Sequence, residues 1–184
     1  VLTHAIEAYT SLIANPYTDA VALETIRMAA KWLPVVFDDG RNIEARAQML
    51  MASCMAAIAF NVTGLGVCHG TGHPLSARLG SAHGQTLAAM LPHVMRFNRS
   101  VCGEKYTQVG AALGVEASAD AAIAEVEAIR ARIGLKKTIK ELGGNADLIE
   151  ALSDDAMADL TTRTNARKVE RSDAKALYEA ALNL

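Results

Sequence analysis

Apolar residues recur every three or four positions along most of the chain, whereas no segment shows the strict alternation of a half-buried strand. This spacing predicts a series of amphipathic helices joined by short turns. The predicted helices cover residues 3–14, 19–33, 43–60, 65–75, 83–97, 104–114, 120–134, 136–143, 147–160 and 172–182. We therefore predict an all-α fold, a multi-helix bundle in which residues 1–184 form a single domain.

Capping residues and prolines indicate where several helices begin and end. Pro16 should end the first helix, and Thr18 and Asn42 are the predicted caps of the second and third. Pro74 is expected to break the fourth helix, and the chain is expected to leave helical conformation at Gly80. Pro92 lies in the middle of the fifth helix, and glycines separate the later ones.

The third predicted helix, residues 43–60, is apolar nearly all the way round beyond Met49. A helix without a polar face is typical of a protein interior. We therefore predict that residues 43–60 form the buried central helix. Alanine is abundant and aromatic residues make up only 4% of the chain, which favours closely packed helices over a β-sandwich.

Charge and composition exclude several classes of partner. The formal net charge is −2 and basic residues are interspersed with acidic ones without forming a basic stripe, so we expect no binding to nucleic acid. No apolar run reaches the roughly 18 residues of a membrane span, so we expect no membrane partner. Cys54, Cys68 and Cys102 follow no disulfide or metal pattern, which indicates a reducing, cytoplasmic setting. Val1 is already in helical register without a preceding cap, so we expect a piece of a longer protein.

Four of the five histidines lie in one glycine-rich stretch, residues 65–98. They are His69, His73, His83 and His93; the fifth is His4. Imidazole is the commonest metal ligand and the commonest acid or base near neutral pH. His69 and His73 are four residues apart and share a helix face. Histidines from separate helices that converge in a bundle core can bind iron, zinc, copper or nickel, so we predict a metal site here.

Other interpretations of this stretch stay open. His93, beside Pro92, is more typical of a structural histidine, and we expect Arg96 and Asn98 to be solvated or capping groups. The glycines allow close approach of backbone to a cofactor or to another helix; they are Gly64, Gly66, Gly70 and Gly72. A non-catalytic helical module with structural histidines is one rival. A metal-dependent hydrolase is a weaker one, because no histidine is followed by aspartate.

Four segments carry a family resemblance: LTHAIEAY, AFNVTGLGVCHGTGHPL, AHGQTLAAMLPHVMRFN and TNARKVERSDAKALYEAAL. In this order they resemble the C-terminal helical domain of the iron-containing alcohol dehydrogenases, which have a dehydroquinate synthase-like fold. The resemblance implies that residues 1–100 form the metal-site half and residues 101–184 a C-terminal helical half. The family's N-terminal α/β domain is not in this sequence.

The resemblance also implies roles for individual residues. It makes His4, His69 and His83 the metal ligands, with an aspartate that would fall just before Val1. His73 corresponds to a histidine near the nicotinamide and substrate, a candidate for proton relay.

The cofactors implied are Fe²⁺ or alternatively Zn²⁺, together with NAD or NADP in the full-length enzyme. The implied substrate is a small alcohol or aldehyde, and the full-length enzyme is expected to be a homo-oligomer. Phe60, Leu65 and Leu79 are weak candidates for the substrate pocket, and Asn61 and Cys68 for cofactor contact. Without the dinucleotide-binding domain, we expect no hydride transfer from this chain alone.

Overall fold

A computed structural model of the protein describes residues 1–183, in which every regular element is helical. The all-α prediction is confirmed. The α-helices are α1 (Leu2–Thr10), α2 (Pro16–Asp38), α3 (Ile43–Thr63), α4 (Val67–Leu79), α5 (His83–Leu113), α6 (Ala119–Arg132), α7 (Ile149–Ala158) and α8 (Arg171–Leu182). Two 3₁₀ turns, η1 (Ala146–Leu148) and η2 (Leu160–Thr164), flank α7.

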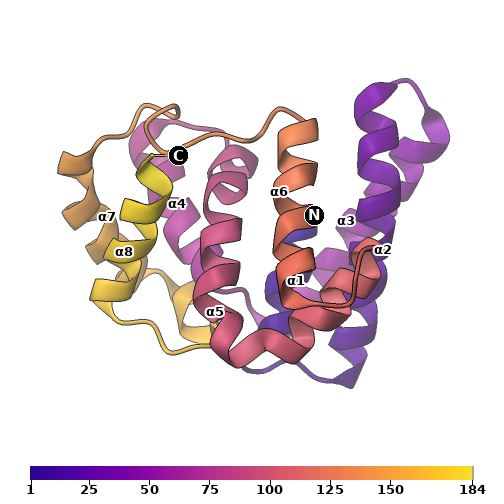
Figure 1. Ribbon diagram of the computed structural model, residues 1–184, viewed down its shortest axis with the longest axis horizontal. Coiled ribbons are helices and arrows are strands. Elements are labelled where there is room, and N and C mark those ends of the chain that lie inside the picture. Colours follow the sequence, from indigo (N-terminus) through magenta and orange to yellow (C-terminus); the bar gives the residue numbers. More distant parts are fainter. Residues whose placement is uncertain (184) are drawn as a thin grey trace.

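Helix α5 is the central element of the bundle (Figure 1). It packs against α1, α2, α4, α6 and α8. The α2–α3 pair forms one end of the molecule in Figure 1, and α7 with α8 forms the other. Helix α4 lies beside α5 and also contacts α7 and η2, so both faces of α4 are covered. Its first turns are therefore buried from Val67 to Gly72.

The prediction that residues 43–60 form the buried central helix is wrong. Helix α3 packs one stripe of alanines, including Ala52 and Ala56, toward its neighbours and leaves its other face in solvent, where Leu50 is 74% exposed. The small alanine side chains allow neighbouring helices to pack closely against one face of α3. No element among the described residues covers its opposite face. By length and composition alone α3 could cross a membrane, and 22% of its apolar window is buried in the structure.

The two helices predicted over residues 83–97 and 104–114 are one helix, α5, of 31 residues. Pro92 lies inside it and cannot donate a hydrogen bond to the carbonyl of Ala88, four residues earlier. The side chain of Arg130 on α6 replaces this donor. Its Nη1 donates to the Ala88 carbonyl at 3.0 Å and more weakly to that of Ala89 at 3.5 Å. A tertiary contact therefore keeps α5 continuous across Pro92.

We expect Arg130→Met to lower the free energy of unfolding by about 1–3 kcal/mol, because it leaves the part-buried Ala88 carbonyl without a donor. Urea unfolding measures the change. Arg132→Met is the matched control, because Arg132 is in the same helix but its side chain is 54% exposed and pairs only with Asp38. That control should stay within about 0.5 kcal/mol of the wild type. Equal losses in the two variants would contradict the role given to Arg130.

Other helix ends differ from the sequence-based prediction. Helix α4 is not broken by Pro74 but continues to Leu79, and it ends as expected at Gly80, with φ of +63°. Residues 136–143 form no helix: residues 136–138 are irregular and residues 139–143 form turns. In that segment Glu141 accepts hydrogen bonds from both the amide and the hydroxyl of Thr138. The backbone of this segment also bonds to α8, because the Ile139 amide donates a hydrogen bond to the Ala181 carbonyl.

At the N-terminal end, α1 stops at Thr10, earlier than predicted, and α2 begins at Pro16. The side chain of Asn15 caps α2, and the predicted cap, Thr18, is its partner in a reciprocal capping box. The predicted cap of α3 is confirmed, since Asn42 accepts from the Ala45 amide at 2.9 Å.

Candidate metal centre

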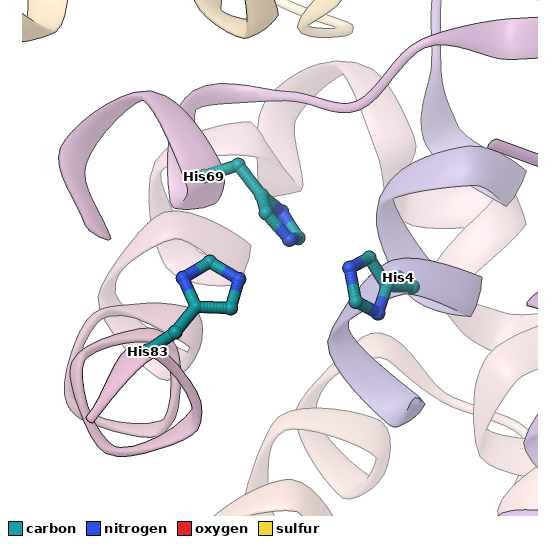
Figure 2. A group of neighbouring side chains, drawn as sticks. All are labelled: His4, His69 and His83. Carbon is teal, nitrogen blue, oxygen red and sulfur yellow. The ribbon is translucent and has the colours of Figure 1, made fainter. Parts of the chain in front are cut away.

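Three histidines from three helices converge at one point of the bundle (Figure 2). His4 lies on α1, His69 on α4 and His83 at the first position of α5. One ring nitrogen of each lies within 4.8 Å of those of the other two. His69 is fully buried, His4 is half-buried and His83 is exposed. We call these three residues the histidine cluster; one side of it is closed by the core and the other is open.

Glu7 fixes the orientation of His69. This glutamate follows His4 by one turn on α1 and is only 4% exposed. Its Oε2 contacts Nδ1 of His69, and its Oε1 accepts a hydrogen bond from the Cys68 amide at 2.7 Å. A carboxylate acts as an acceptor, so this contact favours the tautomer of His69 that carries its ring proton on Nδ1. Nε2 is then left with a lone pair.

The Nε2 atom of His69 is buried and has no hydrogen-bond partner among the described residues. A buried polar atom without a partner costs about 1–3 kcal/mol, and such groups are rare. A metal ion bound by the cluster would satisfy this atom. A carboxylate on Nδ1 with a free Nε2 is also the usual arrangement of a metal-binding histidine. The residues present therefore fit a divalent metal.

The start of α4 is held by side chains that are distant in sequence. Its N-cap, Gly66, has no side chain, and the first free amides are bound instead by Glu7 and by Asn165, whose Oδ1 accepts from Val67 at 3.3 Å. Asn165 also exchanges two amide hydrogen bonds of 2.9 Å with Asn98. The prediction that Asn98 is solvated or capping is therefore wrong, because Asn98 is buried in this network.

The cluster favours neutral imidazoles. Burial first, and then the neighbouring His69, lower the pKa of His4 to about 3 from its usual 6.5. Burial, followed by His69 and His73, also lowers the pKa of His83. Near neutral pH both rings keep the free lone pair that a metal ligand needs.

The lowered pKa of His4 predicts acid sensitivity of the metal-free protein. The unfolded chain binds a proton at His4 near pH 6.5, whereas the folded chain does so only near pH 3. The contribution of His4 to stability is therefore complete above pH 6.5 and is lost as the pH falls toward 3. Urea unfolding of EDTA-treated protein between pH 7 and pH 4 should show a shallower decline for His4→Gln than for the wild type. Parallel profiles would contradict this.

His73 lies beside the cluster and is held by an aspartate that the sequence analysis missed. Its ring centre is 5.3 Å from that of His83 and 5.5 Å from that of His69. Nδ1 of His73 is 2.8 Å from Oδ2 of Asp159, which lies between α7 and η2. Burial opposes ionisation there, but hydrogen bonds from Thr161 and His73 hold the pKa of Asp159 below its usual value.

The predicted substrate-pocket residues lie in different places. Phe60 stacks on His4 with ring centres 4.8 Å apart, whereas Leu65 is buried and Leu79 lies near Gly144. An apolar cavity of about 320 Å³ opens beside His4 and His83. Leucines line it, among them Leu33, Leu87 and Leu91.

The two candidates for cofactor contact also differ. Asn61 is exposed on α3, and its amide donates to the Ala57 carbonyl. Cys68 is fully buried, and burial raises the pKa of its thiol well above the usual value. In this position the Cys68 side chain presents no surface to a cofactor.

The glycines of the histidine stretch approach other parts of the same chain. A Cβ atom on Gly70 would lie 2.0 Å from Oγ1 of Thr162, and one on Gly72 would lie 2.6 Å from a methyl of Leu87. Of the two interpretations, helix packing therefore accounts for these two glycines. Gly64 has φ of +64° and packs on Thr164.

Comparison with known proteins shows the family. Residues 1–182 match the Fe-containing alcohol dehydrogenase family, C-terminal. The chain therefore belongs to the iron-containing alcohol dehydrogenase family.

Individual relatives agree with this. The chain is 42% identical over 181 residues to "Probable alcohol dehydrogenase EutG" of Salmonella typhimurium, covering 98% of the chain and 46% of that protein. It is 32% identical to the NAD-dependent methanol dehydrogenase of Bacillus methanolicus, covering 98% of the chain and 49% of that protein. A crystal structure of 1,3-propanediol oxidoreductase superposes with a TM-score of 0.94 at 33% identity, over 98% of the chain and 49% of that structure. The chain thus spans about half the length of the relatives it matches.

Proposed function

We propose that this chain is the metal-binding half of an NAD(P)-dependent alcohol dehydrogenase that acts on a small alcohol or aldehyde. The observation that carries the proposal is the buried, unpartnered Nε2 of His69 at the meeting point with His4 and His83. Glu7 holds this ring in the orientation and tautomer that a ligand requires. An assembly module would have no reason to bury an imidazole with one nitrogen unsatisfied.

His4, His69 and His83 are the residues that would hold the ion. Neutral imidazole suits Fe²⁺ and Zn²⁺ alike, and three protein nitrogens leave at least one further position for another ligand. The resemblance assigns one such position to an aspartate four residues before His4. A bound divalent ion supplies Lewis acidity, which polarises an alcohol or carbonyl oxygen.

His73 is the proposed proton relay. Its side chain is 41% exposed, so it connects the cluster to solvent. Asp159 accepts from Nδ1, which leaves Nε2 free to take a proton from an alcohol hydroxyl. Asp159 in turn is fixed by the amide and the hydroxyl of Thr161, at 2.8 Å and 2.6 Å. These contacts keep the ring in one orientation, which proton transfer requires.

The surroundings support a small substrate with an apolar part. Phe60 covers one face of His4, and the 320 Å³ cavity beside His4 and His83 has a mostly apolar lining that also includes Arg130. Such a cavity can accept a short hydrocarbon chain while the oxygen lies at the cluster. Hydride transfer itself requires a nicotinamide, whose dinucleotide we propose binds to a part of the protein outside this chain.

A chimera tests the proposal. This chain is joined to the preceding half of the EutG relative, loaded with Zn²⁺ or Fe²⁺, and assayed for alcohol-dependent reduction of NAD or NADP. We expect activity that falls by about 100-fold or more in His69→Ala and by about 100-fold or more in kcat for His73→Ala. His93→Ala, outside the cluster, is the matched control and should keep its activity. Full activity of His69→Ala would refute the metal-binding role.

A further inference from the structure

A second cavity, of about 520 Å³, lies apart from the histidine cluster. It is formed by α5, the ends of α6 and α8, and the segment that follows α6. The backbone bond from the Ile139 amide to the Ala181 carbonyl holds this segment against the end of α8 (Figure 1). We call it the basic cavity. Its lining includes none of the three cluster histidines.

The basic cavity concentrates positive charge. Arg96, Arg130, Lys136 and Lys137 line it, and Glu127 is the one carboxylate among its lining residues within the described range 1–183. Arg96 and Arg130 share that carboxylate, at 2.8 Å and 3.9 Å. Neither lysine makes an ion pair with any residue that the structure describes.

The helix ends at this place do not cancel the charge. α6 and α8 both direct their C-terminal ends to the cavity, and each end is equivalent to about half a negative charge. With Glu127 they leave a surplus of about two positive charges among the described residues that line the cavity, and the Glu141 carboxylate, outside this lining, is close enough to interact with Lys137. His93, which also lines the cavity, responds to this field: burial first, and then Arg96 and Arg130, lower its pKa.

Arg130 gives the second, independent observation. It is 7% exposed, and its Nη1 is occupied by the carbonyls beside Pro92. Its Nε is buried and has no hydrogen-bond partner among residues 1–183. A buried guanidinium is tolerated only when its charge and donors are matched, and a carboxylate at 3.9 Å matches them poorly. Arg130 lines the basic cavity and also the apolar cavity beside His4 and His83. An anion in the basic cavity would balance the charge of this buried guanidinium, although the enclosed Nε itself would stay without a partner.

We propose that the basic cavity binds a small phosphate-bearing anion through Arg130, Lys136 and Lys137. A phosphate dianion matches a surplus of about two positive charges, and guanidinium and ammonium groups are the usual phosphate donors. The cavity is larger than one phosphate group, and alanines, including Ala128 and Ala180, line it beside the cations. There is therefore room for an organic body attached to the phosphate, such as a nucleoside or sugar. Neither the metal nor the proposed dehydrogenase function is needed to infer this site, but Arg130 lines both this cavity and the apolar cavity beside His4 and His83.

The test is a calorimetric titration of the EDTA-treated chain at low salt, first with inorganic phosphate and separately with adenosine 5′-monophosphate. We expect saturable binding that weakens as NaCl is added. Lys136→Gln/Lys137→Gln should raise the Kd about tenfold or more. Arg130→Gln removes the third proposed anion-binding group. If that variant does not fold, the double lysine variant alone still tests the proposal. Tighter binding of adenosine 5′-monophosphate than of phosphate would identify a phosphorylated organic ligand, and equal binding would identify free phosphate.

Lys168→Gln is the matched control, because Lys168 is 86% exposed, pairs with Glu170 and does not line the cavity. Its Kd should equal that of the wild type. The proposal is overturned if neither ligand binds saturably, if the double lysine variant binds as the wild type does, or if Lys168→Gln weakens binding equally.

Discussion

Glu7→Ala is expected to weaken Zn²⁺ binding by about 10–100-fold and to lower the free energy of unfolding by about 3 kcal/mol. The substitution removes the acceptor for His69 Nδ1 and for the Cys68 amide at once, and all three residues are buried. His69 loses its fixed tautomer, and the first turn of α4 loses one of its two side-chain acceptors. Competition titration with a zinc-binding dye and urea unfolding measure the two effects.

Glu7→Gln separates the two effects. Glutamine has the same shape, and its carbonyl oxygen can still accept from the Cys68 amide, so most of the stability should remain. Its NH₂ group would donate to Nδ1 of His69, which forces the ring proton onto Nε2. We therefore expect Glu7→Gln to lose zinc affinity much as Glu7→Ala does. Glu24→Ala, at an exposed pair with Arg27, is the control and should change neither quantity. Unchanged zinc affinity in Glu7→Gln would contradict the tautomer argument.

Gly70→Ala is expected to lower the free energy of unfolding by about 3 kcal/mol or more. The added Cβ would lie 2.0 Å from Oγ1 and 3.2 Å from Cβ of Thr162, so α4 and η2 must separate. Thr162 is itself held by a 2.7 Å bond to the Ala156 carbonyl, so it cannot rotate away without losing that bond. Because His69 is adjacent, zinc affinity should fall as well. Thermal unfolding and zinc titration report the two changes.

Two further variants make this prediction specific. Gly84→Ala is the matched control, because Gly84 is also helical and a Cβ there meets nothing within 4 Å. It should leave stability unchanged or raise it by up to about 1 kcal/mol. Thr162→Ala removes the clashing oxygen, so Gly70→Ala/Thr162→Ala should be more stable than the sum of the single effects predicts. Strict additivity would mean that the clash is not the cause.

The helical character of the chain and the ligand candidates could be predicted from local signals. The spacing of His69 and His73 and the glycines around them mark the stretch, and the family resemblance adds His4 and His83 as partners. The residues that orient them could not be found this way. Glu7 is 61 residues from the amide that it binds, and Asp159 is 86 residues from His73. Such pairs leave no periodic pattern in a single sequence.

The errors in the predicted fold have the same physical origin. Pro92 is a valid helix-breaking signal, but Arg130, 42 residues from the carbonyl to which it donates, supplies the missing hydrogen bond. The apolar surface of α3 is a valid signal of burial, yet whether another element covers Leu50 depends on the arrangement of the whole bundle. In both cases a tertiary contact, or its absence, decides against the local preference.

The central claim is that His4, His69 and His83 bind a divalent metal. The most direct test is elemental analysis of protein purified without added metal and again after incubation with Zn²⁺ or with Fe²⁺ under reducing conditions. The wild type and His93→Ala should contain close to one metal ion per chain, and His69→Ala and His83→Ala should contain almost none. A wild type that stays metal-free after incubation, or equal metal content in all four proteins, would contradict the account.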